Sequence, residues 1–216
     1  MPTVLTTKKL EKNQTELLLN ANISIVEYNA IKIFFAQNLS LPKSVENAII
    51  TSKNAWKAIQ HNTTIKNAFV VGSKTAKLLT DHNIQILEKA ENAQELAEKI
   101  IEKHSEKSFT FFCGNKRRNE LPQQLQQNNI KVEEIEVYKT ELNPKKFQQE
   151  FDGILFFSPS AVQSFTKQNS MKSSTAFCIG KTTASEAKKH TNKIIIANQP
   201  TVENVIVQVV KKYRND

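Results

Sequence analysis

The chain has 216 residues, 39% of them hydrophobic, which is enough for one large domain or two small ones. Lys and Arg outnumber Asp and Glu by 30 to 21, and the net charge of +9 favours an anionic partner such as nucleic acid, anionic lipid or an acidic small molecule. No apolar run approaches the about 18 residues of a membrane span, and the first residues lack the pattern of a signal peptide, so neither a membrane protein nor a secreted one is expected.

Short apolar runs typical of strands alternate along the chain with amphipathic segments typical of helices. In the first half, strands are expected at 4–8, 23–28, 47–52, 68–72 and 84–87. Helices are expected around 16–19 and at 54–60, 74–81 and 93–104. Because strands that alternate with helices form parallel sheets, this half predicts α/β structure.

The second half repeats the order of the first. Strands are expected at 109–113, 130–138, 153–158, 176–180 and 194–196, and helices at 121–127, 160–167, 182–190 and 200–213. One turn also returns: the run Gly72-Ser73-Lys74-Thr75-Ala76 corresponds to Gly180-Lys181-Thr182-Thr183-Ala184. The chain therefore resembles a duplicated module with two parallel α/β sheets.

The lengths of the connections indicate how these elements group into domains. Only residues 105–108 connect the last helix of the first half to the first strand of the second, and short connections keep elements in one sheet. We therefore expect one continuous domain at 34–141 and one discontinuous domain that combines 1–33 with 142–216. Two chain crossings would join them, each just after a tyrosine, Tyr28 and Tyr138. Two sequential domains are the alternative.

Cysteine and histidine are not arranged for metal or thiol chemistry. Cys113 and Cys178 lie in apolar runs without partner spacing, which argues against a disulfide framework and a cysteine zinc site and favours a reducing cytoplasm. The four histidines lie near helix ends with no mutual spacing, as surface residues do. No Gly-x-Ser-x-Gly nucleophile motif occurs. We expect no metal.

Positive charge gathers where ligands bind to parallel α/β sheets, beyond the carboxyl ends of the strands. The windows 6–9, 51–54, 72–75, 114–118, 157–160 and 180–183 contain no acidic residue. Their basic residues are Lys8, Lys9, Lys53, Lys74, Lys116, Arg117, Arg118 and Lys181. Helix N-termini present free N–H groups at the same edge, so these windows suit several carboxylates or phosphates.

The two glycine turns leave two interpretations open. A Walker loop is excluded at Gly180 because Thr175 stands where that loop needs another glycine, and Ser73 separates Gly72 from Lys74 in the first copy. The turns are then either plain helix caps or ligand contacts. Since the chain has only 4 glycines, each is expected to meet a need of the backbone.

Two further features have both a structural and a functional interpretation. The run Lys116-Arg117-Arg118 is short and lacks interleaved aromatic residues, so it favours a solvated helix start over contact with nucleic acid. Tyr138 follows a strand and is either a half-buried core residue or, at the edge of an interdomain cleft, a neutral hydroxyl that donates a proton or a hydrogen bond.

Seven motifs in this order resemble uroporphyrinogen-III synthase. They are Ile-Ile-Thr-Ser-x-Asn-Ala at 49–55, Val-Val-Gly-x-x-Thr-Ala at 70–76, Gly-x-x-Arg-x-x-x-Leu at 114–121, Val-Tyr-x-Thr at 137–140, Phe-Phe-Ser-Pro-Ser-Ala-Val at 156–162, Ile-Gly-x-Thr-Thr-Ala at 179–184 and Pro-Thr-x-x-x-x-Ile at 200–206. Each motif alone is weak, but together they cover nearly the whole chain in the order of that family.

The resemblance implies two flavodoxin-like α/β domains joined by a two-stranded linker, with the first and last segments sharing one domain in a segment-swapped arrangement. It also implies an enzyme of tetrapyrrole (haem and porphyrin) biosynthesis, a cyclising hydro-lyase. Hydroxymethylbilane would lose water, its last ring, ring D, would be inverted, and the chain would close to uroporphyrinogen III. The carboxylates on every ring of this substrate would explain basic windows without acids. We expect a cytoplasmic monomer that uses no cofactor and binds neither nucleic acid nor a membrane.

The resemblance also assigns residues. Tyr138 matches the tyrosine near the leaving hydroxyl and is the expected catalytic residue. Thr75 and Thr183 match threonines that bind carboxylates, and Arg117 is the expected two-pronged partner of a carboxylate. The other expected substrate-binding residues are Thr7, Lys8, Ser52, Gly72, Lys74, Gly114, Ser158, Ser160, Lys181 and Thr182.

Three points stay open at this stage. Thr182 and Thr183 are alternatives for the contact made by their turn. Lys8 stands where the family often has arginine, and it keeps the charge without the two-pronged geometry. A non-enzymatic two-lobed binder of anionic small molecules, such as a sensor domain, would share the fold and the charge and is the competing hypothesis.

Overall fold

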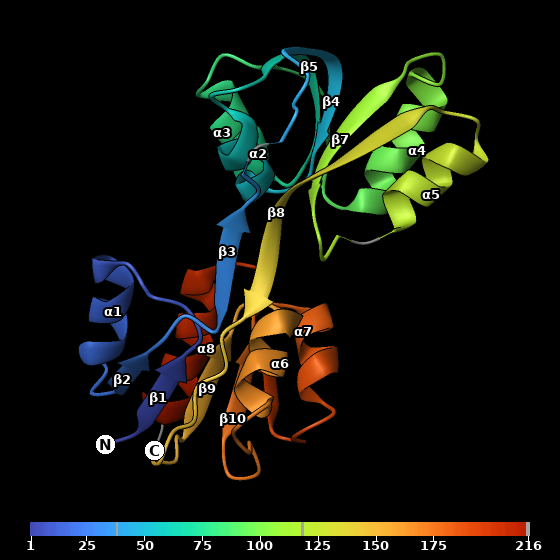
Figure 1. Ribbon diagram of the computed structural model, residues 1–216. Helices are drawn as coiled ribbons and strands as arrows, with labels where there is room; N and C mark the ends of the chain where they lie inside the picture. Colours follow the sequence, from blue (N-terminus) through green and yellow to red (C-terminus); the bar gives the residue numbers. More distant parts are fainter. Residues whose placement is uncertain (38, 118, 215–216) are drawn as a thin grey trace. The chain divides into compact units, whose positions relative to one another are not determined.

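The computed structural model describes residues 1–37, 39–117 and 119–214 (Figure 1). The chain divides into two units: unit 1 comprises Met1–Lys32 and Glu141–Asp216, and unit 2 comprises Ile33–Thr140. Each unit contains its own β-sheet with helices on both faces, and the expected α/β class with parallel sheets is confirmed. Within the described ranges, no helix has both the length and the apolar character needed to cross a bilayer.

Unit 1 is built on a parallel five-stranded sheet in the order β11-β10-β9-β1-β2. Its strands are β1 (Thr3–Thr6), β2 (Ser24–Glu27), β9 (Gly153–Phe156), β10 (Thr175–Cys178) and β11 (Ile194–Ile196). Its helices are α1 (Lys12–Leu19), α6 (Pro159–Thr166), α7 (Lys181–Ala187) and α8 (Val202–Arg214). The central β1 and β9, far apart in sequence, pair directly, which joins the two ends of the chain in one sheet.

Alternate side chains of the unit 1 strands enter two separate cores. Ile154 packs in the cluster that includes residues of α6 and α7, whereas its neighbour Leu155 packs with residues of α1 and α8. This alternation follows from the period of two along a strand, and both faces are covered because consecutive side chains are apolar. The sheet therefore has helices on both faces, and its carboxyl edge is left for the turns that follow the strands (Figure 1).

Unit 2 has a six-stranded sheet in the order β3-β8-β7-β4-β5-β6. Its strands are β3 (Ile31–Phe35), β4 (Ser44–Ile50), β5 (Thr64–Val71), β6 (Gln85–Ala90), β7 (Phe109–Gly114) and β8 (Val132–Leu142), and its helices are α2 (Lys53–Ile59), α3 (Ser73–Thr80), α4 (Ala93–Lys103) and α5 (Glu120–Gln127). On one face Ile50 packs with residues of α2 and α3, and on the other Ile49 packs with residues of α4 and α5.

The segments expected to be linkers contain strand structure. The unit boundaries fall inside β3 and β8, which are neighbours in the sheet. The Ala36 N–H donates to the Val137 carbonyl at 3.0 Å and the Asn143 N–H to the Ala30 carbonyl at 2.9 Å, so the pair runs antiparallel. β8 continues to Leu142, beyond the expected end at residue 138. Two crossing strands thus connect the units.

Two strands also begin earlier than the sequence predicted. β4 starts at Ser44 rather than 47, and β5 at Thr64 rather than 68. In each strand the added residues include one buried apolar side chain between two exposed neighbours. This side chain is Val45 in β4 and Ile65 in β5. The prediction relied on continuous apolar runs, which begin later in both strands. It therefore missed the first residues of each strand, where polar and apolar side chains alternate.

Gly72 and Gly180 begin their helices in different backbone conformations. Gly72 has φ of 82° and ψ of 138°, whereas Gly180 is extended, with φ of −175°, and has open space around it. The expectation that every glycine meets a backbone need is therefore wrong for Gly180. Only the Gly72 conformation is one that side chains rarely adopt.

Gly72→Ala is expected to lower the free energy of unfolding by about 1–3 kcal/mol because alanine is strained at this positive φ. Gly180→Ala is the matched control, since both glycines are N-caps without a side-chain cap and lose the same capping preference. Denaturant unfolding of both variants measures the difference. An equal loss of unfolding free energy in both variants would show that alanine is not strained at the positive φ of residue 72.

Candidate active site

The expected site residues of unit 2 lie along the carboxyl edge of its sheet. β7, β4 and β5 are parallel neighbours, so their ends share one edge. Ser52 follows β4, Gly72 follows β5, and Asn115 to Arg117 follow β7. Tyr138 joins them because it is the register partner of Gly114, the last residue of β7. Tyr138 is half-buried and packs against the core on the α2 and α3 face.

The expected site residues of unit 1 share the equivalent edge. β10, β9 and β1 are parallel neighbours, followed by the turns at 180–183, 157–160 and 7–8. The buried Thr7 hydroxyl donates to the Leu155 carbonyl at 2.7 Å, so it fastens the end of β1 to β9. The Lys8 ammonium lies 5.7 Å from the centre of the Phe157 ring, a cation–π contact that leaves its charge at this edge.

Two serines of the motifs act as helix caps. The Ser52 hydroxyl accepts from the Asn54 N–H at 3.1 Å, and the Ser158 hydroxyl accepts from the Ala161 N–H at 3.1 Å. By contrast, the N-caps of α3 and α7 are Gly72 and Gly180, which provide no side-chain cap. The N–H groups in the first turn of a helix are available to an anion only where no side chain accepts from them. The glycine turns fit carboxylate contacts better than the serine turns do.

The threonines of the two glycine turns are buried. Thr75 is 6% exposed and Thr183 is 1% exposed, whereas Thr182 is exposed. Thr183 shares its buried stripe with Ala184 and Ala187, and this helical spacing was visible in the sequence. The exposed side chains at the turn of unit 1 are thus Lys181 and Thr182, whereas Thr183 is buried on the inner face of α7. Lys74 has the equivalent exposed place in unit 2.

Arg117 has an acidic partner from outside the six windows, which themselves contain no acidic residue. Glu134 on β8 accepts from Nε of Arg117, and Asn119 Oδ1 accepts from Nη1 of Arg117 at 2.9 Å. The hydrogen bond to Glu134 raises the pKa of Arg117 above its usual value. A substrate carboxylate would therefore compete with Glu134 for one side of the guanidinium. No sequence signal pointed to this pair, because Arg117 follows the end of β7 whereas Glu134 is near the start of β8, opposite Phe111. Arg118 lies outside the described residues.

A small pocket of about 270 Å³ opens at the same edge of unit 2. It is lined by Thr51, Val71, Asn92, Ala93, Phe111, Arg117 and Leu121. The Asn92 side chain accepts from the Glu95 N–H at 2.9 Å and so caps α4. Asn92 was missed because the residues after β6 were not included among the windows, although Asn before a helix is a common cap.

Both thiols are buried and protonated. Burial raises the pKa of Cys113 to about 11 and that of Cys178 to about 12. The raised values leave Cys113 with about a hundredfold less thiolate at pH 8 than an ordinary cysteine. We expect native protein to resist iodoacetamide and to gain two labels only in denaturant. Rapid labelling of the native protein would contradict this burial.

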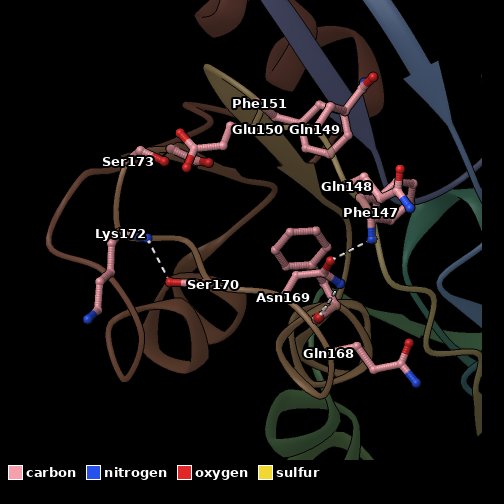
Figure 2. Close-up of a pocket in the computed structure, with 12 residues that line it drawn as sticks. Phe147, Gln148, Gln149, Glu150, Phe151, Gln168, Asn169, Ser170, Lys172 and Ser173 are labelled. Atoms are coloured by element: carbon pink, nitrogen blue, oxygen red, sulfur yellow. Dashed lines mark hydrogen bonds between the residues drawn. The ribbon is translucent and has the colours of Figure 1, made fainter.

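A cavity of about 400 Å³ in unit 1 lies away from the predicted site (Figure 2). It lies between the segments 147–151 and 168–174, which precede β9 and β10 and therefore sit at the amino edge of the unit 1 sheet. Asn169 fastens these segments: its amide donates to the Lys145 carbonyl at 2.7 Å and its oxygen accepts from the Phe147 N–H at 2.9 Å. No expected site residue lines this cavity.

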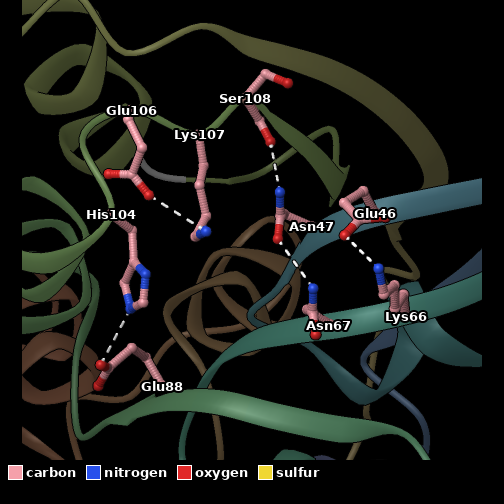
Figure 3. A network of polar contacts seen from close by, with 9 residues as sticks. All are labelled: Glu46, Asn47, Lys66, Asn67, Glu88, His104, Glu106, Lys107 and Ser108. Carbon is pink, nitrogen blue, oxygen red and sulfur yellow. Dashed lines mark hydrogen bonds and ion pairs between the residues drawn. The ribbon is translucent and has the colours of Figure 1, made fainter.

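A network of polar contacts in unit 2 has a structural role (Figure 3). Asn67 donates to Asn47 and Asn47 to the Ser108 carbonyl, both at 3.2 Å, which ties three segments of the sheet together. His104 pairs with Glu88 at 3.3 Å. The described part of the chain has no group of three or more His, Cys, Asp or Glu side chains that could hold a metal.

A family model described as uroporphyrinogen-III synthase HemD matches residues 6–206. The chain belongs to this family. Within the family, the porphyrin biosynthesis protein HemD of Ruminiclostridium josui is 27% identical over 248 residues, which cover 96% of this chain and 48% of that protein. An uncharacterized protein of Rickettsia prowazekii, RP474, is 25% identical over 189 residues, covering 82% of this chain and 65% of that protein. The chain thus spans about half the length of the first relative and somewhat under two thirds of the second.

Two crystal structures of uroporphyrinogen-III synthases share the fold. The enzyme from Helicobacter pylori 26695 has a TM-score of 0.69 and 18% identity, and covers 98% of this chain and 100% of its own. A mutant of the enzyme from Thermus thermophilus has a TM-score of 0.66 and 10% identity, and covers 100% of this chain and 99% of its own. At these sequence identities the comparison shows a shared fold, and the alignments cover 98% and 100% of this chain.

Proposed function

We propose that the chain is a uroporphyrinogen-III synthase that closes hydroxymethylbilane to uroporphyrinogen III with loss of one water and inversion of ring D. The observation that carries this proposal is the family match over residues 6–206, which includes the carboxyl edges of both sheets. The exposed lysines of the glycine turns, Lys74 and Lys181, add positive charge that suits a substrate with carboxylates on every ring.

The proposed reaction asks little covalent chemistry of the protein. The terminal hydroxyl leaves as water after it receives a proton, and the substrate pyrroles supply electrons to form an azafulvenium cation. The substituted carbon of the last ring attacks this cation, and the resulting spiro intermediate fragments and closes again in the inverted sense. Ring closure releases one proton, which balances the one taken up by the leaving hydroxyl. Positioning and proton donation are thus the tasks of the side chains.

Tyr138 is the proposed proton or hydrogen-bond donor to the leaving hydroxyl. It lies at the carboxyl edge of unit 2 and is only half-buried, so its ring is held by the core while part of it meets solvent. Its phenol has one O–H to donate.

The other site residues are proposed to bind carboxylates or to shape the turns that do. Cationic or exposed side chains at the carboxyl edges of the two sheets are proposed to bind carboxylates. They are Lys8, Lys74, Arg117, Lys181 and Thr182. The buried Thr7, Thr75 and Thr183 and the capping Ser52 and Ser158 would hold the turns in place. Gly72 precedes α3, Gly114 ends β7, and Ser160 is in the first turn of α6. We further propose a cytoplasmic monomer without a cofactor, and light scattering of the purified chain tests the oligomeric state.

The isomer composition of the product tests the proposed activity. Hydroxymethylbilane made in situ cyclises spontaneously to uroporphyrinogen I, and porphyrins are separated after oxidation. We expect isomer III in excess when the chain is present. A two-lobed binder without activity would leave isomer I as the product, and that result would refute the proposal.

A further inference from the structure

The phenol ring of Tyr138 occupies the place where Gly114 would carry a side chain. A Cβ atom at Gly114 would lie 2.4 Å from Cζ, 2.5 Å from Cε2 and 2.9 Å from Cε1 of Tyr138. Such distances are too short for carbon atoms, which meet at about 3.5–4.0 Å. The only glycine with positive φ among the described residues is Gly72. Gly114 is therefore required for space and not for backbone conformation.

The next residue fixes the backbone of Tyr138. The register of β7 and β8 shifts between Cys113 and Gly114, and this irregularity brings Gly114 opposite Tyr138. The Asn115 N–H donates to the Tyr138 carbonyl at 3.2 Å, and the Asn115 side-chain oxygen accepts from the Thr140 N–H at 2.8 Å. Bulges of this kind redirect a side chain at the end of a strand. The ring of Tyr138 thus lies against Gly114, the last residue of β7, and its main chain is held by Asn115, the residue that follows.

We propose that Gly114 and Asn115 are positioning residues for Tyr138, which aim its hydroxyl at the leaving group of the substrate. The inference rests on the proposed function. It assigns to Gly114 the role of positioning the Tyr138 ring, in place of direct contact with the substrate. A donor displaced by about 1 Å loses on the order of a hundredfold in rate. A methyl group at Gly114 forces a displacement of this size, because the ring must withdraw by about 1 Å to reach an ordinary contact.

Gly114→Ala tests the proposal with two readouts. Its kcat is expected to fall by roughly tenfold to a hundredfold, while KM stays within about twofold. The chain has 3 tyrosines, so 3-fluorotyrosine labelling gives three fluorine signals, and Tyr138→Phe identifies that of Tyr138. We expect Gly114→Ala to shift this signal. In the Tyr138→Phe background, Gly114→Ala is expected to cause no further loss in kcat.

Gly153→Ala is the matched control. A Cβ atom at Gly153 would lie 2.7 Å from Cε2 of Phe177 and 3.0 Å from the Tyr213 hydroxyl, so the crowding is similar. Gly153 begins β9 and lies at the amino edge of the sheet in unit 1. We expect this variant to shift the Tyr213 signal and to leave kcat unchanged.

Several results would overturn the proposal. These are an unmoved Tyr138 signal in Gly114→Ala, an unchanged kcat, or a further loss of kcat in the Tyr138→Phe background. If Gly114→Ala fails to fold, Tyr138→Ala is expected to relieve the collision, so that the double variant is as stable as Tyr138→Ala alone; a less stable double variant would refute the contact. Asn115→Ala is expected to lower kcat and to shift the same signal. If the wild type made no isomer III, the proposed function would fail, while the fluorine signals and the stability comparison would still decide the positioning.

Discussion

Tyr138→Phe is expected to lower kcat for uroporphyrinogen III formation about a hundredfold while KM changes less than twofold. Phenylalanine keeps the ring against Gly114 and the packing in the core of unit 2, so only the O–H is lost. The substrate is then bound as before, but its hydroxyl leaves without a donor. Initial rates of isomer III formation over a range of hydroxymethylbilane concentrations give both constants.

Tyr28→Phe is the control for this prediction, because Tyr28 also precedes a crossing between the units. Tyr28 is 8% exposed and packs edge to face on Phe147, with ring centres 5.1 Å apart. Burial raises the pKa of Tyr28 to about 12, so its hydroxyl stays protonated. We expect unchanged kinetics for this variant. An equal loss of kcat and of substrate affinity in Tyr138→Phe would instead identify Tyr138 as a structural residue.

Reversing the charge of both glycine-turn lysines is expected to raise KM about a hundredfold. Lys74 and Lys181 are exposed at the carboxyl edge of their respective sheets, and neither forms an ion pair within the ranges that the structure describes. Replacing attraction by repulsion at such a site changes binding by about 1–2 kcal/mol, or about tenfold for each lysine. Because each turn is proposed to bind carboxylates of the substrate and the two lysines belong to different units, the effects of Lys74→Glu and Lys181→Glu are expected to multiply.

The control for this charge reversal is Lys131→Glu combined with Lys172→Glu. These lysines precede β8 and β10, so they lie at the amino edges of the two sheets, and the net charge of the chain changes by the same amount. We expect little change in KM for the control and a smaller effect of the test pair at high salt. Equal effects of the two pairs would mean that net charge, rather than the glycine turns, attracts the substrate.

Much of the fold was predictable because both sheets are largely parallel and buried on both faces. A short continuous apolar run such as Gly153 to Phe156 is typical of a buried strand. The similar glycine turns at Gly72 and Gly180 indicated the duplication. Periodicity alone did not predict β3, although the resemblance implied a two-stranded linker, because β3 lies at a sheet edge with Phe34 and Phe35 exposed, 48% and 46%. Edge strands lose the burial on which such predictions depend.

The edges on which the candidate site lies were predictable, but the contacts within it were not. Strand ends and helix starts follow from periodicity, so the turns at Gly72 and Gly180 could be placed from the sequence. The contact of Gly114 with Tyr138 and the pairing of Arg117 with Glu134 depend on the register of β7 against β8, including its irregularity at Cys113 and Gly114. A single sequence contains no signal for the register of two parallel strands joined by a helix.

The most direct test of the proposed site is hydrogen exchange with uroporphyrinogen III bound under anaerobic conditions. The prediction is slower exchange at the carboxyl edges of both sheets, at 6–9, 157–160 and 180–183 in unit 1 and at 51–54, 72–75 and 114–117 in unit 2. Protection confined to one unit, or to the cavity segments 147–151 and 168–174, would contradict the account.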